Sequence, residues 1–129
     1  MTDHLDDLLG RLHEDRSSLL EDQLRAIERE IAHRRLIGAE NTLRLWEDIT
    51  HLNNQIINAT PNHLQEPDLR EKTRHALEHE RRATQQELNE EIRQTWDAIQ
   101  ELKREQRQLI KELLQDRQRY ERFLRDYDA

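Results

Sequence analysis

A seven-residue apolar repeat runs from Leu88 to Tyr127 without a single Pro or Gly. With Leu88 at position d of the heptad, apolar residues occupy most a and d positions. The a positions are Ile92, Ile99, Gln106, Leu113, Tyr120 and Tyr127, and the d positions are Leu88, Thr95, Leu102, Leu109, Asp116 and Phe123. A helix with such a seam needs a partner helix, because a heptad stripe cannot be buried against its own backbone. We therefore expect the rest of the chain to supply helical partners.

Composition favours a few long helices over a thick globular core. Charged residues make up 38% of the 129 residues and hydrophobic residues only 33%, with two Gly and two Pro in total. So few helix-breaking residues predict a small number of long elements. Charges of mixed sign between periodic apolar residues are typical of solvated helices rather than of disorder. The fold class predicted is all-α.

The first predicted helix covers residues 3–58, with apolar residues recurring at helical spacing from Leu5 to Ile56. Ser18-Leu-Leu-Glu21 has the form of a capping box, so a break near Asp15 is an alternative to a continuous helix. Gly38 falls on the inner stripe, and close approach of the partner helix near Leu88 would explain it.

A break follows at residues 59–67, where Pro61 disfavours helical geometry at Thr60 and Pro67 suits the first turn of a following helix. A second helix over 68–128 completes a single helical-hairpin domain spanning 1–129. So short a connection makes the helices antiparallel neighbours. A symmetric loop places residue i near residue 126 minus i, which pairs Ile27 with Ile99, Leu24 with Leu102 and Leu12 with Leu114.

Near the chain termini both helices carry apolar faces wider than one partner helix can cover, so we expect hairpins to pair through this end into a four-helix bundle and to leave the loop end as a projection. A homodimer is the first expectation, and an unrelated helical partner would satisfy the same residues. The predicted interface residues are Ile27, Ile31, Leu45, Ile49, Ile92, Trp96, Ile99, Leu102, Leu109, Leu113, Tyr120 and Phe123.

Two groups of residues have the spacing of metal ligands. The register above brings Glu47 and His51 of the first helix near His75 and His79 of the second, a set that suits zinc. Seven histidines on charged helices also produce such pairs by chance. Glu30 and His33 match one half of a di-iron motif, but the expected partner region has no second copy of it.

A nucleic-acid-binding strip is a further alternative. Its basic residues are Lys103, Arg104, Arg107, Lys111, Arg117, Arg119, Arg122 and Arg125. Interleaved acids and the net charge of −7 make a solvated coiled-coil face the better interpretation, so nucleic acid is not the expected partner.

Catalytic motifs are absent: we find no phosphate-binding glycine loop, and the only serines are Ser17 and Ser18. The chain has no cysteine and no apolar run long enough to cross a membrane. We therefore expect a cytoplasmic protein that is not an enzyme and needs no cofactor. The predicted function is that of a scaffold, adaptor or assembly factor that acts through protein–protein contacts.

Overall fold

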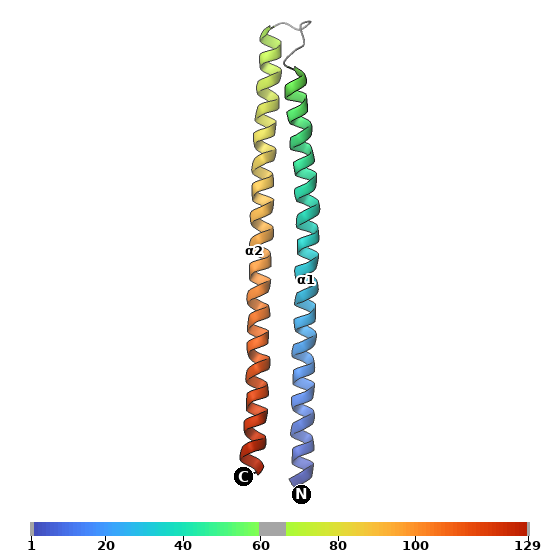
Figure 1. Ribbon diagram of the computed structural model, residues 1–129, viewed down its shortest axis with the longest axis vertical. Helices are drawn as coiled ribbons and strands as arrows, with labels where there is room; N and C mark the ends of the chain where they lie inside the picture. The colour runs from blue at the N-terminus through green and yellow to red at the C-terminus, as the bar shows by residue number, and fades with distance from the viewer. Residues whose placement is uncertain (1, 60–66, 129) are drawn as a thin grey trace. The chain divides into compact units, whose positions relative to one another are not determined.

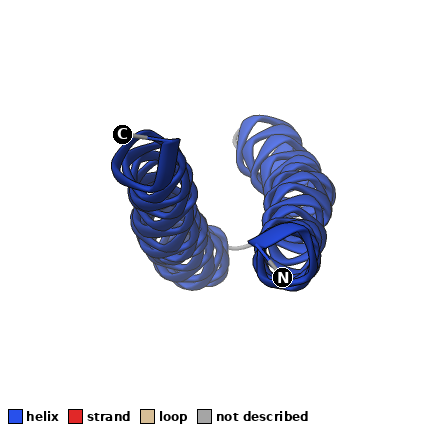
Figure 2. Ribbon diagram, turned by 90° about the horizontal axis from the view of Figure 1, so that it is seen from below, coloured by secondary structure: helices blue, strands red, loops and turns tan. Residues whose placement is uncertain are grey.

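The computed structural model describes residues 2–59 and 67–128, with side chains for 4–59 and 69–127. Two helices make up this part of the chain, α1 (Thr2–Ala59) and α2 (Pro67–Asp128) (Figures 1 and 2). The predicted all-α fold is confirmed, and the helix bounds differ from the predicted ones by a single residue. Most of the predicted loop, residues 60–66, lies outside the described residues.

Each helix is continuous because its sequence offers little that stops one. Leu, Glu and Arg are frequent in both helices, and all three have high helix propensity. Ser17 and Ser18 lie within α1, so the alternative break at the capping box does not occur. Pro67 is the first residue of α2, where its missing amide hydrogen costs nothing.

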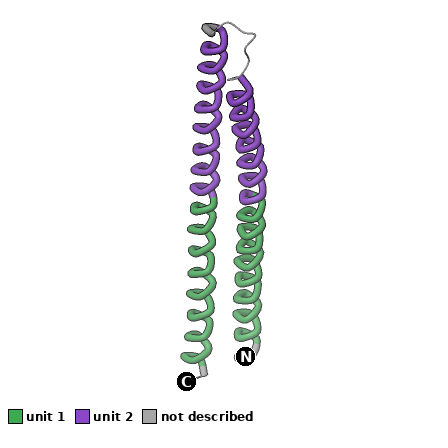
Figure 3. The backbone as a smooth tube through the Cα atoms, turned by 45° about the horizontal axis from the view of Figure 1, so that its top comes forward, with its two compact units in different colours: residues 1–33, 99–129 green, residues 34–98 purple. Residues whose placement is uncertain are grey.

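The chain divides into two compact units, each built from a piece of α1 and a piece of α2 (Figure 3). Unit 1 contains residues 1–33 and 99–129, and unit 2 contains residues 34–98. Within each unit the pieces pack antiparallel: Ile31 packs with Ile99 in unit 1, and Asn41 bonds to Glu91 in unit 2. The helical hairpin is thus present as predicted.

The interhelical seam of unit 1 contains buried apolar side chains. Ile31, Ile99 and Leu102 form a buried cluster, and Ile27 packs against it. Leu20 is buried further toward the N-terminus. In unit 2 the buried apolar side chains are Ile49, Leu52 and Leu88.

The two units use different rows of each helix. One α1 row turns inward in both units, at Leu24, Ile31, Gly38, Leu45 and Leu52. Its companion row lies three residues further on in unit 1, at His13, Leu20 and Ile27, and four residues further on in unit 2, at Thr42, Ile49 and Ile56. On α2 the companion of the d row likewise changes, from Glu91 in unit 2 to Ile99 in unit 1. The inner face therefore does not follow one uninterrupted heptad repeat.

This change corrects the prediction for Ile92. The heptad repeat places Ile92 in the hairpin seam, but its side chain is 50% exposed. Glu91 instead occupies the partly buried position. A strict heptad drifts around an α-helix by about 20° per repeat, and here the seam moves to the neighbouring row.

The predicted register is also wrong. Asn41 pairs with Glu91 rather than lying opposite Gln85, and Asn53 pairs with Arg81 rather than lying opposite Thr73. The described residues of the two helices are therefore not aligned symmetrically about residue 63. Since Asn53 is level with Arg81, Ala59 is level with His75, and the first turns of α2 extend beyond the end of α1 (Figure 1).

Candidate interaction surface

Asp116 is a largely buried charge in the seam of unit 1, with a side chain only 13% exposed. Its Oδ2 lies 3.0 Å from Nδ1 of His13, and its Oδ1 lies 3.1 Å from Nε of Arg16. The His13 ring stacks on Tyr120 with ring centroids 4.2 Å apart. The polar d position therefore has partners on α1, which restrict the alignment of the two helices in unit 1.

Gly38 marks a close approach of the helices in unit 2. A Cβ placed on Gly38 would lie 2.5 Å from Cγ2 and 2.7 Å from Oγ1 of Thr95. The close approach expected at this glycine is confirmed, although its partner is Thr95 and not Leu88. Thr95 is polar at a d position because its short side chain fits against the glycine backbone.

Polar bonds also cross the edges of the unit 2 seam. The Asn41 amide donates to the Glu91 carboxylate at 2.9 Å, and the Arg81 guanidinium donates to Oδ1 of Asn53 at 3.2 Å. Because the two pairs lie at different levels, they fix the alignment of the helices together with the Gly38–Thr95 contact.

Large apolar side chains remain exposed outside the seam. Of the predicted interface residues, Ile31, Ile49, Ile99 and Leu102 are buried, and Ile92 and Trp96 are exposed. The half-buried ones are Ile27, Leu45, Leu109, Leu113, Tyr120 and Phe123. Exposed apolar residues beyond that set include Leu12, Leu19, Leu36, Leu43, Trp46, Ile110 and Leu114.

Five exposed residues of unit 2 lie on one side of the helix pair. Each follows an inward-facing residue by one position: they are Ala39, Leu43, Trp46, Ile92 and Trp96. In an antiparallel pair, a step of one residue turns both right-handed helices toward the same side. We call these five residues the tryptophan face. It contains both tryptophans of the chain, 57% and 61% exposed.

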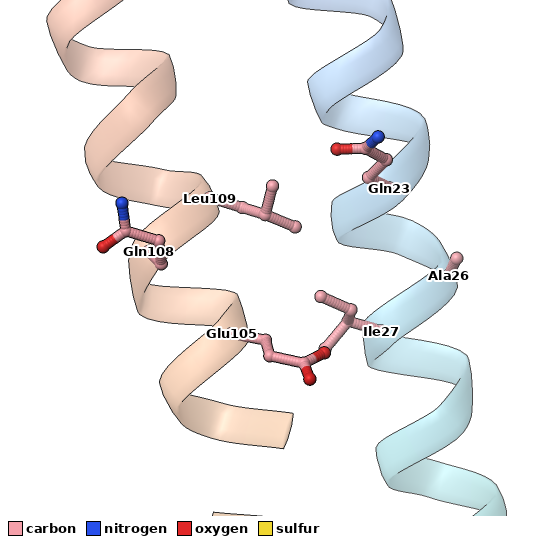
Figure 4. Close-up of a pocket in the computed structure, with 6 residues that line it drawn as sticks. All are labelled: Gln23, Ala26, Ile27, Glu105, Gln108 and Leu109. Atoms are coloured by element: carbon pink, nitrogen blue, oxygen red, sulfur yellow. The ribbon is translucent and has the colours of Figure 1, made fainter. Parts of the chain in front are cut away.

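A shallow groove lies beside the seam of unit 1. Ile27 and Leu109 point toward each other from α1 and α2, and Gln23, Ala26, Glu105 and Gln108 complete the lining (Figure 4). The exposed leucines Leu5, Leu12 and Leu19 follow α1 at seven-residue intervals, and Ala26 continues that row into the groove. Unit 1 thus also presents apolar surface outside its core.

The structure does not bring the proposed metal ligands together. Glu47, His51, His75 and His79 are all exposed, and His51 contacts Gln55 of its own helix at 3.2 Å. Among the described residues no group of three or more His, Asp or Glu side chains is placed to hold a metal ion. The register correction explains this, because His75 is level with the end of α1 and not with His51.

The basic strip of α2 is mostly exposed and mixed with acids. Arg104 pairs with Glu101 at 3.5 Å, and Arg117 lines a depression of unit 1 whose lining also includes Glu14 and Glu21. Exposed pairs of this kind are typical of a solvated coiled-coil face.

No family model, curated protein or solved structure matches this chain. In the part of the chain that the structure describes, neither helix contains an apolar stretch that could span a bilayer.

Proposed function

We propose that this protein is a non-enzymatic coiled-coil interaction module that self-associates into a four-helix bundle, as a scaffold, adaptor or assembly factor. The observation that carries the proposal is the apolar surface outside the seam. Four leucines of α1 between residues 5 and 19, and both tryptophans of unit 2, are each at least 47% exposed. Exposed apolar surface of this extent commonly marks a protein–protein interface.

Self-association fits the distribution of these residues, because both helices contribute them. A four-helix bundle covers such faces by placing two hairpins together. A cytoplasmic location is part of the proposal, and the absence of cysteine is compatible with a reducing compartment. No arrangement of side chains in the described residues favours metal binding as a second function.

The molar mass in solution tests the proposal. Light scattering across a range of protein concentrations is expected to give a dimer of twice the 15.7 kDa chain mass. A mass of one chain at every concentration would contradict self-association. Measuring small-angle scattering on the same samples gives the shape of the associated species independently of its mass.

A further inference from the structure

We infer that the tryptophan face of unit 2 is the surface through which a second copy of this chain binds, with α1 of each copy against α2 of the other. The inference rests on the self-association proposed above and specifies its surface and its orientation. Tryptophan is enriched among the residues that dominate binding energy at interfaces. Having both tryptophans of the chain more than half exposed on one side is therefore the main observation.

The levels of the five residues make the face compact. Gly38 lies against Thr95 and Asn41 against Glu91, so Ile92 is level with residues between Ala39 and Leu43. Trp96 is level with the α1 turn just before Ala39. Small Ala39 thus leaves room between large neighbours, which suits the insertion of side chains from a facing helix.

Charged residues flank the face on both helices. On α1, Glu40 and Glu47 each follow a residue of the face by one position. On α2, Arg93 and Asp97 do the same, so this edge carries both signs. Glu40 and Arg93 lie at the same level of the hairpin, given the contact of Gly38 with Thr95, and they form an opposite-charge pair that a second copy can complement.

A second copy brings Glu40 against Arg93 in only one of two symmetric arrangements. A twofold axis parallel to the helices places α1 over the partner's α2, so the α1 edge with Glu40 meets the α2 edge with Arg93. A twofold axis across the helices places α1 over α1 and α2 over α2, which keeps Glu40 and Arg93 apart. Charges at an interface rim set orientation and suppress wrong pairings more than they add affinity.

One pair of residues reports on this geometry. Glu40 is level with Arg93 within one hairpin, given the alignment of Gly38 with Thr95. With the axis parallel to the helices, corresponding levels of the two copies coincide, and Glu40 of each copy meets Arg93 of the other. Arg93 contacts Glu90 of its own helix at 3.5 Å, an exposed pair that is easily exchanged.

Tryptophan emission and molar mass of the full chain, followed together against concentration, test the surface. We expect the emission to shift to the blue as dimers form, because every tryptophan lies in the face. Leu43→Glu keeps both tryptophans and should weaken dimerisation by more than about tenfold, with emission that stays red-shifted. Arg44→Glu is the matched control: Arg44 is exposed and precedes the inward-facing Leu45, so it turns to the opposite side of the helix pair, and its variant should dimerise like the unsubstituted chain.

The outcomes separate the two proposals. A monomer at every concentration would contradict self-association and this surface together. A dimer that Leu43→Glu leaves intact, with helix content unchanged by circular dichroism, would overturn the surface while self-association stands.

A charge exchange tests the orientation. Glu40→Arg and Arg93→Glu should each weaken dimerisation about fivefold, because symmetry repeats the affected pair. The double variant should recover the affinity of the unsubstituted chain. If the double variant is weaker than both single variants, the arrangement of α1 against the partner's α2 is wrong.

Discussion

Asp116 and Gly38 show how single residues align two helices that otherwise present similar apolar stripes. Asp116 contacts both His13 and Arg16 of α1 in unit 1. In unit 2 the Thr95 side chain packs so close to the backbone of Gly38 that a Cβ at Gly38 would overlap it. A polar or small residue in a seam is least favourable when it is misaligned, so each such contact penalises other registers.

Gly38→Ala is expected to destabilise unit 2. Alanine improves helix propensity by about 1 kcal/mol, but its Cβ would overlap Thr95, and overpacking of this kind costs about 1–3 kcal/mol. Adding Thr95→Ala should recover most of the loss, because it removes the two atoms nearest to the new methyl group. Urea denaturation followed by circular dichroism measures both.

Gly10→Ala supplies the matched control in α1. A Cβ there would meet only the hydroxyl of Tyr120 at 3.4 Å, an ordinary contact. This variant should gain about 0.5–1 kcal/mol from helix propensity. Equal effects of the two alanine substitutions would contradict the close approach at Gly38.

Replacing the His13–Asp116 contact by leucines should raise stability. A nearly buried polar pair in a seam often contributes less than well-packed apolar residues, so His13→Leu with Asp116→Leu should add about 1–2 kcal/mol to the free energy of unfolding. Asp116→Ala alone should lower it, since it removes packing and leaves His13 without its carboxylate. A double variant that unfolds at lower urea than the unsubstituted protein would show that the contact itself stabilises the fold.

At the scale of the helix, the inward-facing row differs between the two units. Residues at the same heptad position can therefore be buried in one unit and exposed in the other. Ile92 and Ile99 are consecutive a positions, yet Ile99 is 9% exposed and Ile92 is 50% exposed. Ile99 packs in the cluster of Ile31 and Leu102. The burial of an a position therefore depends on which unit contains it.

Ile99→Ala should reduce the free energy of unfolding by about 2–4 kcal/mol, as is usual for a buried aliphatic residue. Ile92→Ala at the same dilute concentration should cost less than about 1 kcal/mol, because half of the side chain already contacts water. Thermal or urea melts of the two variants give the comparison. Similar losses of unfolding free energy in the two variants would show that Ile92 is buried in the hairpin seam.

The residue pattern predicted the helices well because periodicity is a local property. Both helix bounds were predicted to within one residue, and the seam was correct at Ile31, Ile49, Leu88, Ile99 and Leu102. The register was not predictable in the same way. Apolar stripes match almost equally well when shifted by a turn or two, and pairs such as Asn53 with Arg81 decide between the alternatives.

The metal site illustrates the same limit. His51 and His75 converge only if the loop is symmetric, and the observed alignment moves His75 to the level of Ala59. The tryptophan face, by contrast, was predicted in part, because Trp96 is one of the predicted interface residues. Which side of the helix pair it occupies became clear only once the inward-facing residues of each unit were known.

At the scale of the whole molecule, apolar surface outside the seam links stability to association. A dimer that buries this surface stabilises the folded chain by mass action. The melting temperature should therefore rise with protein concentration, by a few degrees across the range in which light scattering detects dimer formation. Leu43→Glu should melt at a temperature that does not depend on concentration.

The alignment of the helices also implies an order of folding. Asn53 and Arg81 are 28 residues apart in the chain and Asn41 and Glu91 are 50 apart, whereas His13 and Asp116 are separated by more than a hundred. The entropy cost of closing a loop grows with its length, and contacts between distant residues form late. We therefore expect the helix segments of unit 2 to pair first, which shortens the loop that must close when unit 1 forms. Pulsed hydrogen exchange during refolding should show amides of residues 34–59 and 69–98 protected before those of 4–33, and the reverse order would place the nucleus at the chain ends.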